Sequence, residues 1–146
     1  KTAYDMLRSL VGSEMCIRDR HKRVAATYKY LMYNNLGEAY LVNQNYVRAE
    51  KFFQEAFRYR PEDYSLFKKI ADTYYLRGEF DLALQYIKKG ETASPTDYNW
   101  PLAAAAILFE RGLNDEAMLE IEKVKKLAPG ENIFLLENLK TIYNFE

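Results

Sequence analysis

Small, aromatic and apolar residues recur along this chain at helical spacing, and the whole pattern returns after 34 residues, as from Ala49 to Ala83. In the stretch 30–63 a first stripe follows the helical order i, i+3, i+4, i+7 and consists of Tyr33, Leu36, Gly37 and Tyr40. A second stripe with the same period consists of Ala49, Phe52, Phe53, Ala56 and Phe57. The pattern predicts a helix from about Tyr30 to Asn43 and a second one capped by Asn45. The second helix must end before Pro61, because proline cannot continue a helix.

Small residues occupy the positions where the two helices of a unit would approach each other. Gly37 and Ala49 stand there in the first unit, and only a short side chain allows such a contact. The equivalent positions in the three units are Gly37, Ala71 and Ala105, then Ala49, Ala83 and Ala117, and finally Pro61, Pro95 and Pro129. A fixed period of this length is typical of a solenoid built from one repeated pair of helices.

The order of these residues resembles the tetratricopeptide repeat. In the first unit the matching residues are Tyr33, Leu36, Gly37, Tyr40, Ala49, Phe53, Ala56 and Pro61. In the second they are Phe67, Ile70, Ala71, Tyr74, Phe80, Ala83, Ile87 and Pro95, with Gly90 where the family usually has alanine. In the third, the second helix fits through Ala117, Ile121, Val124 and Pro129, but Pro101 and Leu108 replace the aromatic residues of the first helix.

The resemblance implies an all-α fold, a right-handed solenoid of three helix-turn-helix repeats with a C-terminal capping helix. We expect the repeats at 30–63, 64–97 and 98–131 and the terminal helix at 132–145. Together they would form a single domain that spans residues 21–146.

Capping and turn residues predict the helices of the later units. In the second unit we expect helices at about Tyr64–Arg77 and Phe80–Gly90, with Asp63 as the first N-cap. Gly78 would supply the left-handed turn between them. In the third unit we expect one helix from near Trp100 and another at about Glu116–Leu127.

The N-terminal segment has a different origin on sequence grounds. Tyr4 to Arg20 closely resembles the peptide translated from a sequencing adaptor, so we expect residues 1–20 to be a non-native segment outside the fold. The alternative is a short native amphipathic helix with a stripe of Met6, Leu7, Leu10 and Val11. Since the chain lacks an initiating methionine, we expect the native protein to begin further upstream.

Composition narrows the classes of partner. The chain has 146 residues, 49% of them apolar, and a formal net charge of zero. That is enough apolar material for one core, and the interspersed charges favour neither nucleic acid nor an anionic membrane as a partner. No apolar run reaches the length of a membrane span.

The residues that enzymes and metal sites need are scarce. His21 is the only histidine, and Cys16 is the only cysteine and falls in the adaptor-like segment. Gly78, Gly90, Gly112 and Gly130 are isolated at helix ends and form no phosphate-binding loop. We therefore predict no catalytic residues, no metal site and no cofactor, and a protein that is not an enzyme.

In proteins of the family that this chain resembles, the first helices of successive repeats line a concave groove that takes an extended or helical peptide. Carried onto this chain by the repeat spacing, the groove residues are Asn34, Glu38, Leu41, Lys68, Asp72, Tyr75, Leu102, Ala106 and Phe109. They are charged at one end and apolar at the other. The resemblance thus implies a non-catalytic module that binds a partner protein or peptide.

Other interpretations stay open at this point. The chain could be the repeat portion of a larger enzyme or regulator, or a structural scaffold in an envelope assembly complex. Leu102 and Phe109 could pack under the terminal helix, and the run 103–106 of alanines could serve close packing. The subgroup that clamps the carboxyl terminus of heat-shock chaperones is not favoured, because Asn34 and Glu38 stand in place of its lysine and asparagine.

Overall fold

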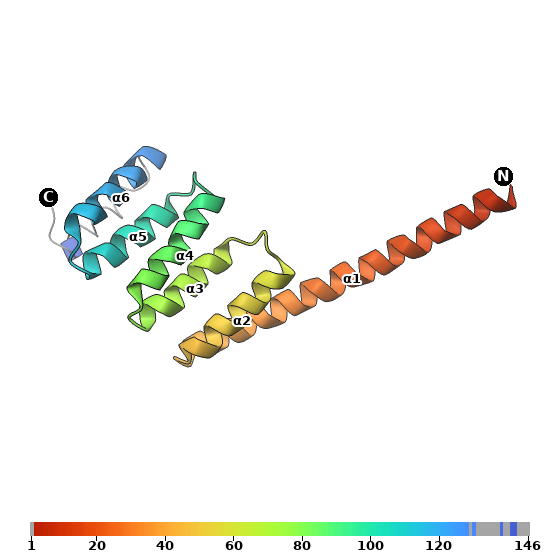
Figure 1. Ribbon diagram of the computed structural model, residues 1–146, viewed down its shortest axis with the longest axis horizontal. Helices are drawn as coiled ribbons and strands as arrows, with labels where there is room; N and C mark the ends of the chain where they lie inside the picture. The colour runs from red at the N-terminus through yellow and green to blue at the C-terminus, as the bar shows by residue number, and fades with distance from the viewer. Residues whose placement is uncertain (1, 129, 131–137, 139–140, 143–146) are drawn as a thin grey trace.

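The structure is a stack of helices with one long N-terminal arm (Figure 1). It is a computed structural model that describes residues 2–128, 130, 138, 141 and 142. In these residues there are six α-helices and no strand. The helices are α1 (Ala3–Val42), α2 (Tyr46–Tyr59), α3 (Ser65–Leu76), α4 (Phe80–Ala93), α5 (Asn99–Glu110) and α6 (Asn114–Leu127).

Each helix packs against the next one along the chain, so that α1 pairs with α2, α3 with α4 and α5 with α6. Short turns at 43–45, 77–79 and 111–113 connect the helices of each pair. The middle residue of every turn has a positive φ, and Gly78 and Gly112 follow Gln44 at intervals of one repeat. The predicted all-α solenoid of helix pairs is confirmed. The predicted terminal helix at 132–145 lies outside the continuous part of the described chain.

Helix boundaries differ from the predictions in ways that have local causes. The cap at Asn45 is confirmed, because its side chain accepts a hydrogen bond from the backbone N–H of Arg48. For α3 the N-cap residue is Tyr64, one position after the predicted Asp63. The Asp63 carboxylate still accepts from the backbone N–H of Ser65 at 3.2 Å, so it satisfies a donor in the first turn.

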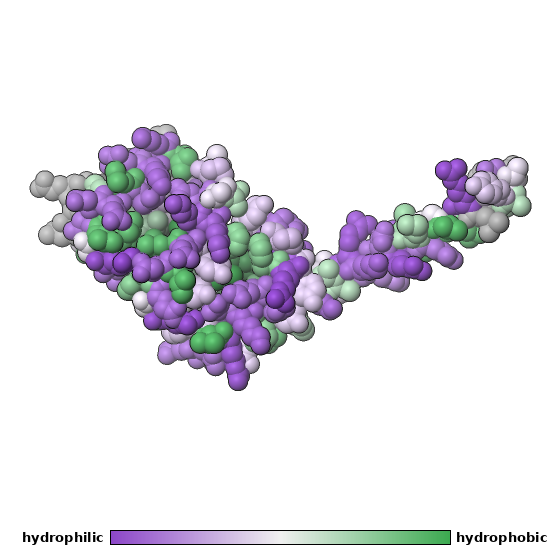
Figure 2. Space-filling view, viewed as in Figure 1, coloured by the Kyte–Doolittle hydropathy of each residue, from purple (hydrophilic) through white to green (hydrophobic). Residues whose placement is uncertain are grey.

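The largest departure is in α1, which begins at Ala3 rather than at about Tyr30. No proline interrupts this stretch, and Thr2 and Asp5 form a capping box that closes its N-terminal end. The first part of the helix projects away from the stack with no other element beside it (Figures 1 and 2). Leu10 and Val11 are more than half exposed, so the stripe proposed for this segment covers no core.

Small residues lie at the contacts between paired helices, as predicted. Ala49, Ala83 and Ala117 are each 0% exposed. A Cβ atom on Gly37 would overlap the ring of Phe53, which itself is completely buried. The repeat period therefore specifies where the helices come closest.

Gly90 allows a similarly close contact between helices of two neighbouring repeats. The ring of Trp100, from α5, packs on the α4 backbone at Gly90 so closely that a Cβ atom there would overlap ring atoms Cζ3 and Cη2. This contact explains why glycine stands where related repeats have alanine. The larger Trp100 side chain uses the space that alanine would otherwise occupy.

We predict that Gly90→Ala lowers the free energy of unfolding by about 1–3 kcal/mol, because overpacking against Trp100 outweighs the gain of about 1 kcal/mol in helix propensity. Chemical denaturation followed by circular dichroism measures the change. Gly12→Ala is the control, since a Cβ there meets no atom within 4 Å. In a Trp100→Leu background the Gly90→Ala cost should shrink, and an undiminished cost would show that the ring is not its cause.

Deleting residues 1–20 should leave the free energy of unfolding within about 0.5 kcal/mol of the full chain, because no other element lies beside this arm (Figure 1). Denaturation of the truncated and full-length chains checks this. A loss of more than about 1 kcal/mol would mean that the arm supports the first repeat.

Candidate functional site

The nine predicted groove residues lie at equivalent places on three helices. One repeat separates the members of each row, so the rows run across α1, α3 and α5. The rows are Asn34, Lys68 and Leu102, then Glu38, Asp72 and Ala106, and finally Leu41, Tyr75 and Phe109.

At the polar end, a lysine that sequence reasoning missed joins two helices. The ammonium of Lys69 on α3 donates to the Asn34 side-chain oxygen at 2.8 Å and pairs with the Glu38 carboxylate on α1. Its side chain also passes over the Phe53 ring, with Nζ 5.7 Å from the centroid. Asn34 and Glu38 are therefore engaged in holding the first repeat to the second.

The neighbouring charges are more accessible. Lys68 and Asp72 form an ion pair of 3.2 Å one turn apart on α3, and both side chains are about half exposed, at 52% and 47%. An exposed pair of this kind contributes little to stability, with typical values of about 0–1 kcal/mol. Both groups can therefore exchange this pairing for a ligand at small cost.

The apolar end is only partly open. Leu41 and Tyr75 are half-buried against the larger core cluster, while Leu102 and Ala106 are half-buried on α5. Phe109, however, is 5% exposed and lies in the second core cluster with Ala105, Leu108, Ala117 and Ile121. Its ring is therefore buried among apolar residues of α5 and α6 and is not open in the groove. The open apolar surface of this end is formed by the half-buried side chains instead.

Tyr75 links the last two units through its hydroxyl. Burial raises the pKa of this hydroxyl, and the charge and hydrogen bond of Glu110 raise it further. The group therefore stays neutral in the physiological range and donates a hydrogen bond. Its ring packs against Phe80 with centroids 5.7 Å apart, which fixes its orientation.

A second polar network lies at the C-terminal end of α3. The sequence predicted no polar contacts there. The Tyr74 hydroxyl donates to Glu50 at 2.5 Å, and Arg77 pairs with the other Glu50 oxygen at 2.9 Å. Burial, with the hydrogen bond to Glu50, raises the pKa of Tyr74 above its usual range. Arg77 also pairs with Glu79 at 2.6 Å. Both carboxylates of this network pair with Arg77, and the contact with Glu50 indicates a structural link between α2 and α3.

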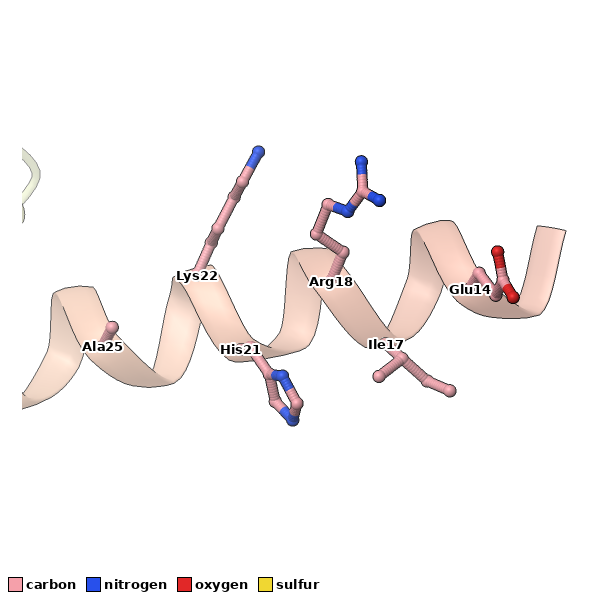
Figure 3. Close-up of a pocket in the computed structure, with 6 residues that line it drawn as sticks. All are labelled: Glu14, Ile17, Arg18, His21, Lys22 and Ala25. Atoms are coloured by element: carbon pink, nitrogen blue, oxygen red, sulfur yellow. The ribbon is translucent and has the colours of Figure 1, made fainter. Parts of the chain in front are cut away.

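A shallow hollow on the N-terminal arm is not a comparable site. All six residues that line it belong to α1, and they are Glu14, Ile17, Arg18, His21, Lys22 and Ala25. In Figure 3, Ile17 and His21 point to one side of the helix and Arg18 and Lys22 to the other. The imidazole of His21 is exposed and converges with no acid or metal ligand in the described chain.

The described residues were also compared with the requirements of a metal site and of a membrane-spanning helix. Among the described residues, no three His, Cys, Asp or Glu side chains gather into a group that could hold a metal ion. Within the same residues, no helix combines the length and the apolar character that crossing a membrane requires.

The sequence of this chain matches a known protein family over one of its repeats. Residues 31–63 match the family model described as "Tetratricopeptide repeat", which corresponds to the first predicted unit. A comparison with the sequences of curated proteins gave no significant match.

Several solved structures share the fold at low sequence identity. MamA superposes with a TM-score of 0.62 at 21% identity, over 67% of this chain and 57% of its own, so this chain spans little more than half the length of MamA. The first TPR of Spaghetti (RPAP3), bound to the HSP90 peptide SRMEEVD, gives 0.66 at 20% identity, over 80% of this chain and 92% of its own. The Yersinia enterocolitica type III secretion chaperone SycD, in complex with a peptide of the translocator YopD, gives 0.64 at 21% identity, over 77% and 85%.

The family model and the fold agree with the repeat read from the sequence. The matched segment ends at the turn before α3, and the helix pairs that follow it continue the same order of packing. The chain therefore contains a tetratricopeptide repeat at residues 31–63, and the helix pairs that follow continue the same fold.

Proposed function

We propose that this protein is a non-catalytic interaction module that binds a segment of a partner protein along the rows on α1, α3 and α5. Two of the structures with the same fold were solved with peptides, an HSP90 peptide on Spaghetti and a YopD peptide on SycD. Repeat proteins of this architecture present extended surfaces for binding, which supports the same class of function here.

The observation that carries the proposal is the contrast between the faces of α3 and α5. The sides of these helices that contact neighbouring helices are closed, as Leu66 and Thr73 show by being 0% exposed. The row positions Asp72, Leu102 and Ala106 stay half-open although they lie on the same helices. This strip therefore leaves a mixture of apolar and charged side chains partly accessible on α3 and α5.

The side chains in the rows indicate which partner side chains would bind there. An apolar side chain would lie against Leu102 and Ala106, beside the half-buried Tyr75. A charged group would lie near Lys68 and Asp72, where it could replace one member of their ion pair. Apolar anchors carry most of the energy of such interfaces, whereas charges at the rim act mainly on the association rate.

A peptide library displayed on phage and selected on the wild-type protein tests the proposal. For the selected peptides we expect Leu102→Glu to raise the dissociation constant at least about tenfold, equivalent to about 1.4 kcal/mol. Lys68→Ala should raise it only a few fold, with most of the change in the association rate at low salt. Calorimetry gives the affinities and stopped-flow fluorescence gives the rates.

Leu119→Glu is the matched control, because Leu119 is 63% exposed on α6 and lies outside the rows. It should leave the affinity unchanged, and circular dichroism should show that all variants remain folded. If the selected peptides bind Leu102→Glu and Leu119→Glu equally well, the rows are not the binding surface.

A further inference from the structure

A stack of four aromatic rings runs through the first repeat. Tyr59 lies on Tyr33 with ring centroids 5.7 Å apart, Tyr33 on Phe52 at 6.1 Å, and Phe52 on Tyr40 at 5.2 Å. The first ring, Tyr59, comes from the last turn of α2 and lies near the ammonium of Lys29, at 5.3 Å. Its ring thus closes the outer end of the stack.

The second repeat has a corresponding row of three rings, although its first pair, Phe67 and Tyr86, is tilted by 56° and not stacked. Phe67, Tyr86 and Tyr74 follow one another at 6.2 and 5.5 Å, at the positions equivalent to Tyr33, Phe52 and Tyr40. The position equivalent to Tyr59 is Ala93, in the last turn of α4. A methyl group replaces the ring at this position, and Phe67 is instead contacted by Phe57 from α2, with ring centroids 4.9 Å apart.

The structure has a hollow at this place. It lies between the start of α3 and the end of α4, with Phe67, Tyr64 and Ala93 among the residues that line it. Tyr64 stacks on Phe67 at 6.2 Å and is 40% exposed, so it forms a wall and does not fill the space. The hollow therefore offers aromatic and aliphatic surface at the position that corresponds to the Tyr59 ring of the first repeat.

The rim of the hollow is positively charged. Lys88 and Lys89 line it, and the ammonium of Lys89 lies 4.1 Å from the centroid of the Tyr86 ring. Neither lysine forms an ion pair with a carboxylate in the part of the chain that the structure describes. A ligand that carries a carboxylate next to its ring would therefore match both the apolar floor and the free positive charge.

We propose that this hollow binds an aromatic side chain of a partner protein, presented beside acidic residues. The partner ring would lie against Phe67 in the place that Tyr59 takes in the first repeat, and its acidic neighbours would pair with Lys88 and Lys89. The site shares no residue with the rows on α1, α3 and α5, so it would add a second point of attachment outside the groove.

A short peptide, acetylated Glu-Asp-Tyr-Asp-Glu amide, is a direct probe of the hollow. Titrated into the full chain and followed by ¹⁵N and ¹³C NMR, it should give saturable shifts at Phe67, Lys89 and Ala93, with a dissociation constant on the order of 1 mM, as befits one anchoring ring. Replacement of its tyrosine by alanine, or of its acidic residues by lysine, should each weaken binding by about tenfold or more.

Ala93→Tyr restores the ring that the first repeat has, so it should fill the hollow and weaken peptide binding at least about tenfold. Ala39→Tyr, at an exposed position of α1, is the matched control and should have no effect. Reversal of the rim charge in Lys88→Glu with Lys89→Glu should weaken binding several fold, whereas the same change at the exposed Lys125 and Lys126 should not.

The outcomes separate this proposal from the groove. Leu102→Glu should leave binding of the tyrosine peptide unchanged. Three results would overturn the proposal: no saturable shifts at about ten times the expected dissociation constant, equal affinity for wild type and Ala93→Tyr, or equal affinity for the tyrosine and alanine peptides. If Ala93→Tyr does not fold, the charge-reversal pair and the two altered peptides decide by themselves.

Discussion

The close approach of helices at residues with little or no side chain is the constraint on which the rest of this structure depends. At Gly37 the ring of Phe53 occupies the space of the missing Cβ, and at Gly90 the ring of Trp100 does the same. Because interiors are packed as densely as organic crystals, each such pair locks the distance and the rotation of two helices. The contact at Gly37 lies within a repeat and the contact at Gly90 lies between repeats, so together they propagate the stack.

Polar contacts then fasten neighbouring repeats at their surface. Lys69 reaches from α3 to α1, and Arg111 pairs with Asp81 at 2.6 Å across α5 and α4. Each exposed pair of this kind contributes little to stability. Its geometry nevertheless favours one relative position of the two helices, which apolar packing alone specifies less strictly. These ion pairs also neutralise charged side chains that would otherwise be available to a ligand. This is why Glu38 is less available to a partner than Lys68 and Asp72 of the next repeat.

The two proposed binding surfaces lie where the repeats differ from one another. The last row ends in Phe109, which is buried in the second core cluster, whereas its equivalents Leu41 and Tyr75 stay half-open. The aromatic stack of the first repeat ends in Tyr59, whereas the equivalent residue of the second repeat is Ala93, which lines the hollow. A shared fold at about 20% identity therefore says little about ligands, because the ligand-facing positions are those that the period does not constrain.

The sequence by itself determined the class of the fold, the pairing of the helices and the buried small residues, because the spacing of Ala49, Ala83 and Ala117 is a local property that survives in the stack. It also located the three rows, since equivalent positions in a repeat face the same way. Only the tertiary structure decided which row positions are open. The exposure of Phe109, the bridge from Lys69 to Asn34 and the hollow at Ala93 depend on side chains that are distant in the chain. Such contacts follow from the register of one helix against another, which no periodicity within a single helix can supply.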